Sequence, residues 1–504
     1  PLQPHRKGVN KDFVDGAGIL SPGRWKIRDR RLPDTSVAQE LRNTLAEALK
    51  DMDGKLAGGS SKATLALLMA GKLDKSPFPE AEVERLRSTL SDVLEQYGFD
   101  RGEPRAGDAA QATDTRLVQA LLEAFGDPDW YFCIWWSLGV WLGSPWRPLP
   151  RAPAIFNRKV KWAIKEDGNE LHGEWRANYS SLKDHEVQVL KQYDREIADG
   201  MLGKETLGEA LDIYGHDLTI AATGALAKKG TSPDGEVRVI YDGTNGIYLN
   251  YGIKVRDQVQ FPAAPDIKAV LAELYEEGGS FISLLIDVSK AHRRVPVLPE
   301  EWGRQACQVT GTAAETAQKK RAGWIPPASL EERPPPLSRS DFSAAQLSED
   351  VYVNKVGTFG VASAGYWWGR LGAAIMRLGH YFVGYHDALW TLLYSDDGKI
   401  TGRTDHPERG LLLFLLVIVA VKLPLSWHKV RGGKEVEWVG YLLDVGRFEM
   451  GVTASRAAWA VRWLTDKATE GNVRLGELRE GLGRLQFLAG TMEYIRPFLG
   501  PLYA

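Results

Sequence analysis

Two adjacent aspartates at a sharp turn constrain this chain more than any other feature. Residues 394–398 read Tyr-Ser-Asp-Asp-Gly and follow the apolar run 389–393, a pattern typical of a strand, a tight turn and a second strand. Neighbouring carboxylates repel each other when both are ionised, and Mg²⁺, which prefers carboxylate oxygens, relieves that repulsion. A metal-free turn is the plain alternative, because Asp tolerates left-handed backbone and Gly supplies positive φ.

A third carboxylate stands upstream at Asp287. It ends the apolar run 281–286, which predicts a buried strand. If this strand lies beside the hairpin, Asp287 and Asp396 can hold two metal ions about 4 Å apart, an arrangement that serves in-line phosphoryl transfer. The alternative is that Asp287 caps a helix formed by the residues that follow it.

These residues resemble the palm of reverse transcriptases of the retrotransposon type, in which one Asp on a strand meets a Tyr-x-Asp-Asp hairpin. The segment 359–368 is similar to the family segment that supports the template and the incoming nucleotide, with Gly365 where Pro is usual. Residues 425–429 resemble the strand that carries a lysine near the active site. The resemblance runs from about residue 176 to the end of the chain.

The resemblance implies an α+β right-hand polymerase with fingers, a palm built on an antiparallel sheet, and a thumb, preceded by a mainly helical N-terminal region. The function implied is that of an RNA-directed DNA polymerase, a nucleotidyltransferase that extends a primer on an RNA or DNA template with deoxynucleoside triphosphates. The expected parts are a helical region of unknown role at 1–145, a basic and aromatic linker at 146–175, fingers and palm at 176–448 with an insertion at about 311–349, and a helical thumb at 449–504.

The resemblance also implies the catalytic residues. Asp287 and Asp396 are expected to bind two Mg²⁺ ions, for which Mn²⁺ is a possible substitute, while Asp397 assists and the backbone of Val288 completes the metal sphere. Lys429 is expected to protonate or neutralise the departing pyrophosphate. For the segment around Lys429, core packing is the alternative.

Nucleotide and primer contacts follow from the same resemblance. The residues expected to bind the nucleotide are Lys229, Arg238, His292, Phe359 and Gly360. Those expected to grip the primer end are Trp438, Gly440 and Tyr441. Alternatively, Lys229 and Arg238 simply form the solvated face of a hairpin, and Lys228 could take the role of Lys229. For the turn at Trp438, Gly440 and Tyr441, the alternative is packing in the core.

Two positions depart from the family pattern. His292 stands where the family has Phe or Tyr, a ring that excludes a ribose 2′-hydroxyl, so it either blocks that hydroxyl or hydrogen-bonds to it. Lys290 stands where many relatives have an acid, and it either aids nucleotide binding or is solvated.

Composition narrows the class of protein. With 504 residues and 44% hydrophobic content the chain can bury large cores, but its net charge of −2 gives no overall sign of nucleic-acid binding. The stretch 146–165 is basic and aromatic, and it either tracks phosphates and bases or docks as a linker on its neighbours. Two distant cysteines argue against disulfides and fit an intracellular protein, cytoplasmic or nuclear. The apolar stretches 130–142 and 411–421 are too short for membrane spans, so no membrane association is expected.

Helical periodicity is clear near both ends of the chain. The spacing predicts helices at 36–52, with Ser36 and Gln39 as a capping pair, at 79–97, at 457–464 and at 475–488. The first two suggest a small helical domain, and the last carries glycines expected mainly to permit close packing. The stretch 311–349 is expected to be an irregular surface loop.

Two other functions remain open at this stage. An RNA-dependent RNA polymerase would share the palm chemistry, although it usually carries Gly-Asp-Asp where this chain has Tyr-Ser-Asp-Asp. A catalytically inactive palm that acts as a nucleic-acid-binding scaffold is favoured by His292 and Gly365 and disfavoured by the presence of all three acids. Oligomeric state is not indicated by the sequence.

Overall fold

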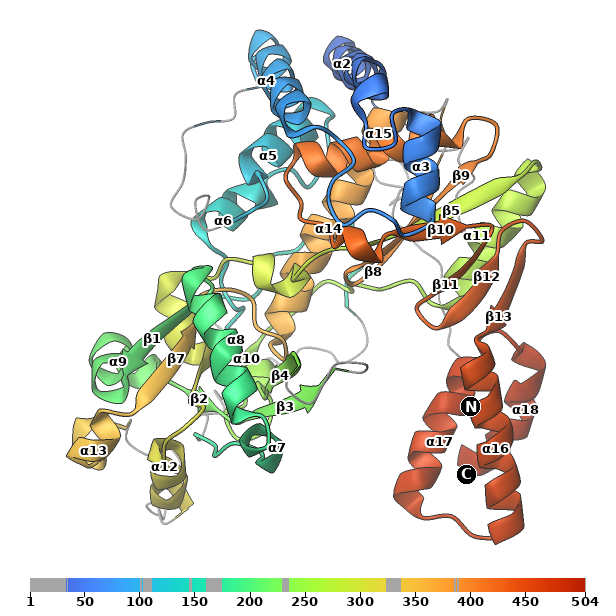
Figure 1. Ribbon diagram of the computed structural model, residues 1–504. Coiled ribbons are helices and arrows are strands. Elements are labelled where there is room, and N and C mark those ends of the chain that lie inside the picture. The colour runs from blue at the N-terminus through green and yellow to red at the C-terminus, as the bar shows by residue number, and fades with distance from the viewer. Residues whose placement is uncertain are drawn as a thin grey trace.

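Helices surround several small, mostly antiparallel sheets in this computed structural model (Figure 1). It describes residues 33, 35–99, 102, 111–144, 147–159, 175–228, 235–322, 337–384, 387 and 389–503.

The central sheet is antiparallel and contains the predicted strand and hairpin. Its strands, in spatial order, are β10 (Arg431–Gly433), β5 (Phe281–Asp287), β9 (Asp397–Arg403) and β8 (Leu389–Tyr394). Strands β8 and β9 are joined by a two-residue turn, and β9 pairs with β5 so that Asp287 lies directly opposite Asp397. The predicted strand 281–287 and the hairpin at 389–403 are therefore confirmed.

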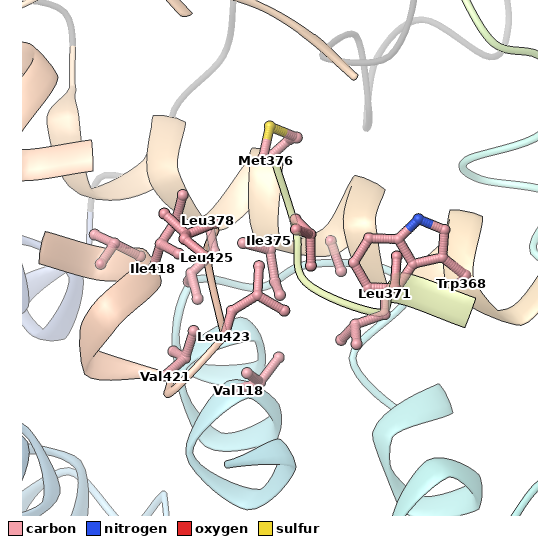
Figure 2. Close-up of a cluster of buried hydrophobic side chains, with 14 of the residues drawn as sticks. Val118, Trp368, Leu371, Ile375, Met376, Leu378, Ile418, Val421, Leu423 and Leu425 are labelled. Carbon is pink, nitrogen blue, oxygen red and sulfur yellow. The ribbon is translucent and has the colours of Figure 1, made fainter. Parts of the chain in front are cut away.

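Both faces of the central sheet are covered, as the unbroken apolar run of β5 requires. Alternate residues such as Leu284 and Ile400 belong to a core shared with α14 (Ala362–Val383) and α15 (Pro407–Ala420). Figure 2 shows side chains of α14 packed beside Ile418, Val421 and Val118. The intervening residues, among them Leu285, pack against α11 (Ala264–Glu277) and the three-stranded sheet of β11 (Glu435–Trp438), β12 (Tyr441–Asp444) and β13 (Glu449–Val452).

The N-terminal helices share a core with α14 and α15. They are α2 (Ser36–Met52), α3 (Ser61–Met69), α4 (Glu80–Gln96), α5 (Thr115–Ala124) and α6 (Phe132–Leu138). The predicted helices at 36–52 and 79–97 are confirmed, but α2 is capped by Thr35, whose hydroxyl accepts from the Ala38 N–H, and not by Ser36. Because α2, α3 and α4 contact α15, they do not form a domain with a core of its own.

Two buried ion pairs fasten α14 to the loop before α6. Arg377 donates to both carboxylate oxygens of Asp127, and Arg370 donates to Asp129, with all four side chains at most 1% exposed. Fully buried charges are tolerated only when they are paired, so these contacts fix the position of α14 along its axis.

A second group of elements surrounds a small mixed sheet, drawn mainly in green and yellow in Figure 1. The sheet strands are β1 (Leu202–Thr206), β7 (Asp350–Asn354), β6 (Ala306–Cys307) and β2 (Ile220–Ala221). Beside it lies the hairpin of β3 (Thr223–Ala227) and β4 (Val237–Tyr241). Its helices are α7 (Ser180–Lys183), α8 (Glu186–Ala198), α9 (Leu207–Tyr214), α10 (Leu249–Gly252), α12 (Ala313–Ala322) and α13 (Ala344–Leu347).

The stretch 311–349 is more regular than expected. Lys319 and Lys320 lie on α12, and the Lys320 Nζ is 3.1 Å from the Asp341 carboxylate. The expectation of an irregular loop is thus wrong for the described part, while residues 323–336 lie outside the described residues.

The C-terminal part consists of a three-stranded sheet followed by helices that stand apart from the rest in Figure 1. These elements are β11 (Glu435–Trp438), β12 (Tyr441–Asp444), β13 (Glu449–Val452), α16 (Ala454–Glu470), α17 (Leu475–Leu488) and α18 (Arg496–Leu499). The two predicted helices are confirmed. A Cβ on Gly481 would lie 2.2 Å from the Trp463 ring, whereas Gly476 and Gly483 face open space, so close packing explains one glycine only.

The described part of the basic linker docks on its neighbours. Phe156 is buried against Ala373 of α14, and Arg151 forms a 2.9 Å ion pair with buried Asp257. These contacts favour the docking interpretation for 147–159, while Trp146 and residues 160–174 lie outside the described residues. No helix among the described residues is long and apolar enough to cross a bilayer.

Candidate active site

The turn between β8 and β9 is held from two sides. Ser395 adopts left-handed backbone with φ of 56°, and its carbonyl accepts a hydrogen bond from the Trp368 Nε1–H of α14 at 2.9 Å. The Asp396 carbonyl accepts from the Val288 N–H, also at 2.9 Å. The turn is therefore anchored both to α14 and to the end of β5, which fixes where the Asp396 side chain can reach.

Asp287 is held by a lysine. The Lys429 Nζ lies 3.0 Å from both carboxylate oxygens of Asp287, and the Asp287 side chain is 14% exposed. Lys429 sits on a 3₁₀ turn, η9 (Trp427–Lys429), not on the strand that was expected. A hydrogen bond from the Ser426 N–H to the Asp287 carbonyl fixes the position of this turn, because it joins the segment to the end of β5.

The surroundings of Asp397 disfavour the ionised form of its carboxyl group. Burial, together with the neighbouring charges of Asp396 and Asp287, raises the pKa of Asp397 to about 6, against the opposing influence of Lys429 and Arg431. Half-buried carboxylates that crowd one another need a cation for all of them to be ionised at neutral pH. The sheet edge thus has the electrostatics of a cation site.

Oxygen donors for a hard cation gather at this edge. Asp287 and Asp397 face each other in register, and Asp396 lies on the adjoining turn. The Val288 N–H, one residue beyond β5, donates to the Asp396 carbonyl. In the described part of the chain, however, no group of three His, Cys, Asp or Glu side chains lies close enough to hold a metal ion, and Asp287 accepts instead from Lys429.

The residues expected to bind the nucleotide lie partly together. Arg238 on β4 has its guanidinium 5.9 Å from the ring centroid of Phe359, which is 49% exposed. Gly360 follows with φ of 110°, and a Cβ there would lie 1.9 Å from the Tyr241 carbonyl oxygen, so only Gly fits. Lys229 lies outside the described residues, and Lys228 forms a 2.6 Å ion pair with Glu236.

His292 lies between the nucleotide residues and the carboxylates. Its ring is edge-on to Phe359 with centroids 6.0 Å apart. Burial lowers the pKa of His292, and the nearby Asp396 opposes that shift. A Cβ on Gly365 would lie 3.8 Å from the His292 Nε2, an ordinary van der Waals contact, so this position lies beside the ring. Lys290, the other departure, is in a 2.9 Å ion pair with Asp199.

The predicted primer turn is present, but its rings face inward. Val439 and Gly440 both have positive φ, as a two-residue turn between β11 and β12 requires. Trp438 and Tyr441 are only 3% and 6% exposed, and Tyr441 stacks on Phe487 of α17 with centroids 4.4 Å apart. Both rings pack in the core, which leaves the backbone of the turn as the part that can face a ligand.

Three residues with a position in or behind the site were assigned no individual role from the sequence. Asn250 of α10 accepts from the Ala362 N–H at 2.8 Å and donates to the Gly360 carbonyl at 2.7 Å, joining α10 to the start of α14. Trp368 holds the Asp-Asp turn. Lys399, two residues after Asp397, is buried among apolar neighbours and donates to the Thr401 hydroxyl. None of the three leaves a local signal, since β9 itself reads Asp-Gly-Lys-Ile-Thr-Gly-Arg and is not an apolar run.

Comparison with known proteins gives weak similarities only. No protein-family model matches the chain, and no curated protein matches it. Among solved structures, the chain is similar to a foamy viral protease-reverse transcriptase (dRH) bound to double-stranded DNA, with 14% identity over 66% of this chain and 45% of that chain and a TM-score of 0.42.

Two further foamy viral protease-reverse transcriptase structures give similar values. One, with double-stranded DNA, has 14% identity over 69% of this chain and 57% of that chain, with a TM-score of 0.40. The other, with an RNA/DNA hybrid, has 13% identity over 77% of this chain and 40% of that chain, with a TM-score of 0.39. The chain spans roughly half the length of these proteins.

Proposed function

We propose that this protein is a primer-extending polymerase of the reverse transcriptase type, an RNA-directed DNA polymerase. The observation that carries the proposal is the register of the central sheet, which sets Asp287 opposite Asp397 with Asp396 on the adjoining turn. The charges of Asp396 and Asp287 help burial to raise the pKa of Asp397 to about 6, and a divalent cation drawn in among these three carboxylates would relieve that repulsion.

The proposed cofactor is a pair of Mg²⁺ ions, with Mn²⁺ as a substitute. Asp287, Asp396, Asp397 and the Val288 carbonyl would hold them, and Lys429 must then release Asp287. When bound, such ions lower the pKa of the attacking hydroxyl and neutralise charge on the leaving phosphates. Lys429 is 51% exposed, so its ammonium can turn from Asp287 toward the departing pyrophosphate and donate a proton there.

The proposed substrates are deoxynucleoside triphosphates and a primed RNA or DNA template. Arg238 would bind phosphate oxygens, as a planar guanidinium does well, and Phe359 would support the base or sugar. The backbone at Gly440 would contact the primer end. In this scheme the central sheet is the palm, the β3–β4 hairpin belongs to the fingers, and α16 and α17 form the thumb.

The test is extension of a labelled DNA primer on an RNA template with Mg²⁺. Wild-type protein should extend the primer with deoxynucleotides, and Asp396→Asn should reduce the rate by at least about 10³-fold, because a metal ligand is lost. The matched control is Asp405→Asn, an exposed acid paired only with Arg403 in the described structure, which should extend at the wild-type rate.

The same assay separates the rival functions. Extension with ribonucleotides alone would indicate an RNA polymerase, whereas binding of primer and template without any extension would indicate a scaffold. A comparison of His292→Tyr with wild type tests sugar selection, since the larger ring should exclude ribonucleotides more strongly. Unchanged extension in Asp396→Asn would remove the carboxylates from the chemistry.

A further inference from the structure

A cavity of about 620 Å³ opens beside the candidate nucleotide residues, between α8, the β3–β4 hairpin and the segment after β5. Arg238 and Phe359, two of the residues proposed to bind the nucleotide, line this cavity themselves, together with Lys290. The carboxylates Asp287, Asp396 and Asp397 do not line it. The cavity therefore includes part of the proposed nucleotide site and extends from there to α8.

The cavity is strongly cationic although the whole chain is slightly acidic. Six basic side chains line it, against the two acids Glu196 and Glu236. The basic residues are Lys191, Arg195, Lys228, Arg238, Lys290 and Arg293. A concave surface with this excess of positive charge concentrates field lines and attracts polyanions.

Pairing with acids divides the six cations into two groups. Lys228, Lys290 and Arg293 are held by Glu236, Asp199 and Glu196 respectively. Lys191 and Arg238, by contrast, form no ion pair among the described residues, and Arg195 reaches only 3.9 Å from Glu236 with both side chains largely exposed. An exposed pair at that distance contributes little, so three cations are available to a ligand.

We propose that the α8 side of this cavity is a polyphosphate-binding subsite beside the incoming nucleotide, in which Lys191 and Arg195 bind the anion. The ligand is a chain of phosphates. It is either inorganic pyrophosphate or the triphosphate group of a second nucleoside triphosphate. Pyrophosphate as the ligand rests on the proposed function, because polymerisation would release pyrophosphate beside Arg238. The volume, within the usual range for small-molecule pockets, admits either.

The experiment measures binding of inorganic pyrophosphate, and separately of a nucleoside triphosphate, by calorimetry in the absence of divalent metal. The double variant Lys191→Gln with Arg195→Gln should bind pyrophosphate at least tenfold more weakly than wild type. Lys62→Gln with Lys72→Gln removes the same charge from exposed positions that do not line the cavity and should bind normally. In primer extension, the first double variant should need a tenfold higher pyrophosphate concentration for inhibition at an unchanged nucleotide KM.

Each outcome decides one point. Tighter binding of pyrophosphate than of the triphosphate identifies the reaction product as the occupant, and the reverse order identifies a second nucleotide. Equal pyrophosphate binding by wild type and the cavity variant overturns the proposal, as does a parallel rise in nucleotide KM, which would merge the cavity with the nucleotide site. Asp396→Asn should bind pyrophosphate as tightly as wild type. The binding assay therefore tests the cavity independently of whether the protein extends a primer.

Discussion

Lys399 lies in an environment that disfavours its charge. It lies on the same face of β9 as Asp397, opposite Leu285 and Leu392, and its ammonium donates to the Thr401 hydroxyl at 2.6 Å. Burial lowers the pKa of Lys399 from 10.5 to about 7. No carboxylate pairs with it among the described residues, so its positive charge below pH 7 is uncompensated.

Replacing Lys399 with Met should therefore stabilise the protein in a pH-dependent way. Between pH 7 and 10.5 the unfolded chain binds more protons at Lys399 than the folded one, so this lysine costs most stability below pH 7 and less as pH rises. We expect Lys399→Met to gain on the order of 5 kcal/mol at pH 6 and little at pH 10. Thermal unfolding of both proteins at pH 6, 8 and 10 measures this, and a gain that is constant across pH would contradict it.

Lys429 is expected to matter for activity and not for folding. Its ion pair with Asp287 is half-exposed on the lysine side, and such pairs contribute about 0–1 kcal/mol. Lys429→Met should therefore change the melting temperature little, but lower the single-turnover extension rate by about 10²-fold if the lysine donates a proton. Lys434→Met, at an exposed position nearby in the sequence, is the control. A full rate in Lys429→Met would assign the pair a purely structural role.

At the scale of elements, the start of α14 depends on a clamp from outside the helix. The amide of Asn250 bonds to both the Gly360 carbonyl and the Ala362 N–H, one of the N–H groups that a helix leaves without an internal partner. The same segment carries Phe359 and leads into the helix that bonds to the Asp-Asp turn through Trp368. The clamp thus links α10 to both halves of the candidate site.

Asn250→Ala should loosen this junction without unfolding the protein. Asn250→Ala removes three side-chain hydrogen bonds at a partly exposed position, one of them to the Thr244 hydroxyl, which are worth about 2–4 kcal/mol together. We expect faster hydrogen exchange at the amides of 360–363 and a several-fold higher KM for the nucleotide, with a loss of global stability no larger than that sum. Asn43→Ala on the surface of α2 is the control. Unaltered exchange at 360–363 would show that the clamp does not hold the helix start.

At the scale of the whole molecule, the N-terminal helices and the central sheet form one structural unit. Leu41 and Leu45 of α2 belong to the same core as Leu371 of α14 and Leu416 of α15. Since α14 in turn supports the turn that carries Asp396, the helices α2, α3 and α4 stabilise the candidate site from behind.

Leu45→Ala, at a side chain 1% exposed, should therefore weaken regions far away in the sequence. A loss of about 2–5 kcal/mol is expected for a buried leucine. Hydrogen exchange should rise together in α2, α14 and α15, and Leu475→Ala, at a leucine 62% exposed, should leave all three protected. Faster exchange restricted to the N-terminal helices would instead show that they unfold independently.

Sequence alone determined the elements whose signal is local. An unbroken apolar run ending in Asp287, an Asp-Asp turn behind another apolar run, and leucines at helical spacing identify β5, the β8–β9 hairpin, α2 and α17, because each pattern reflects which side of one element is buried. Tertiary structure decided the contacts between distant segments. Residue 287 meets 429, 250 meets 360, and 368 meets 395 only after the sheet and α14 have packed, since hydrogen bonds across such separations leave no period in the sequence.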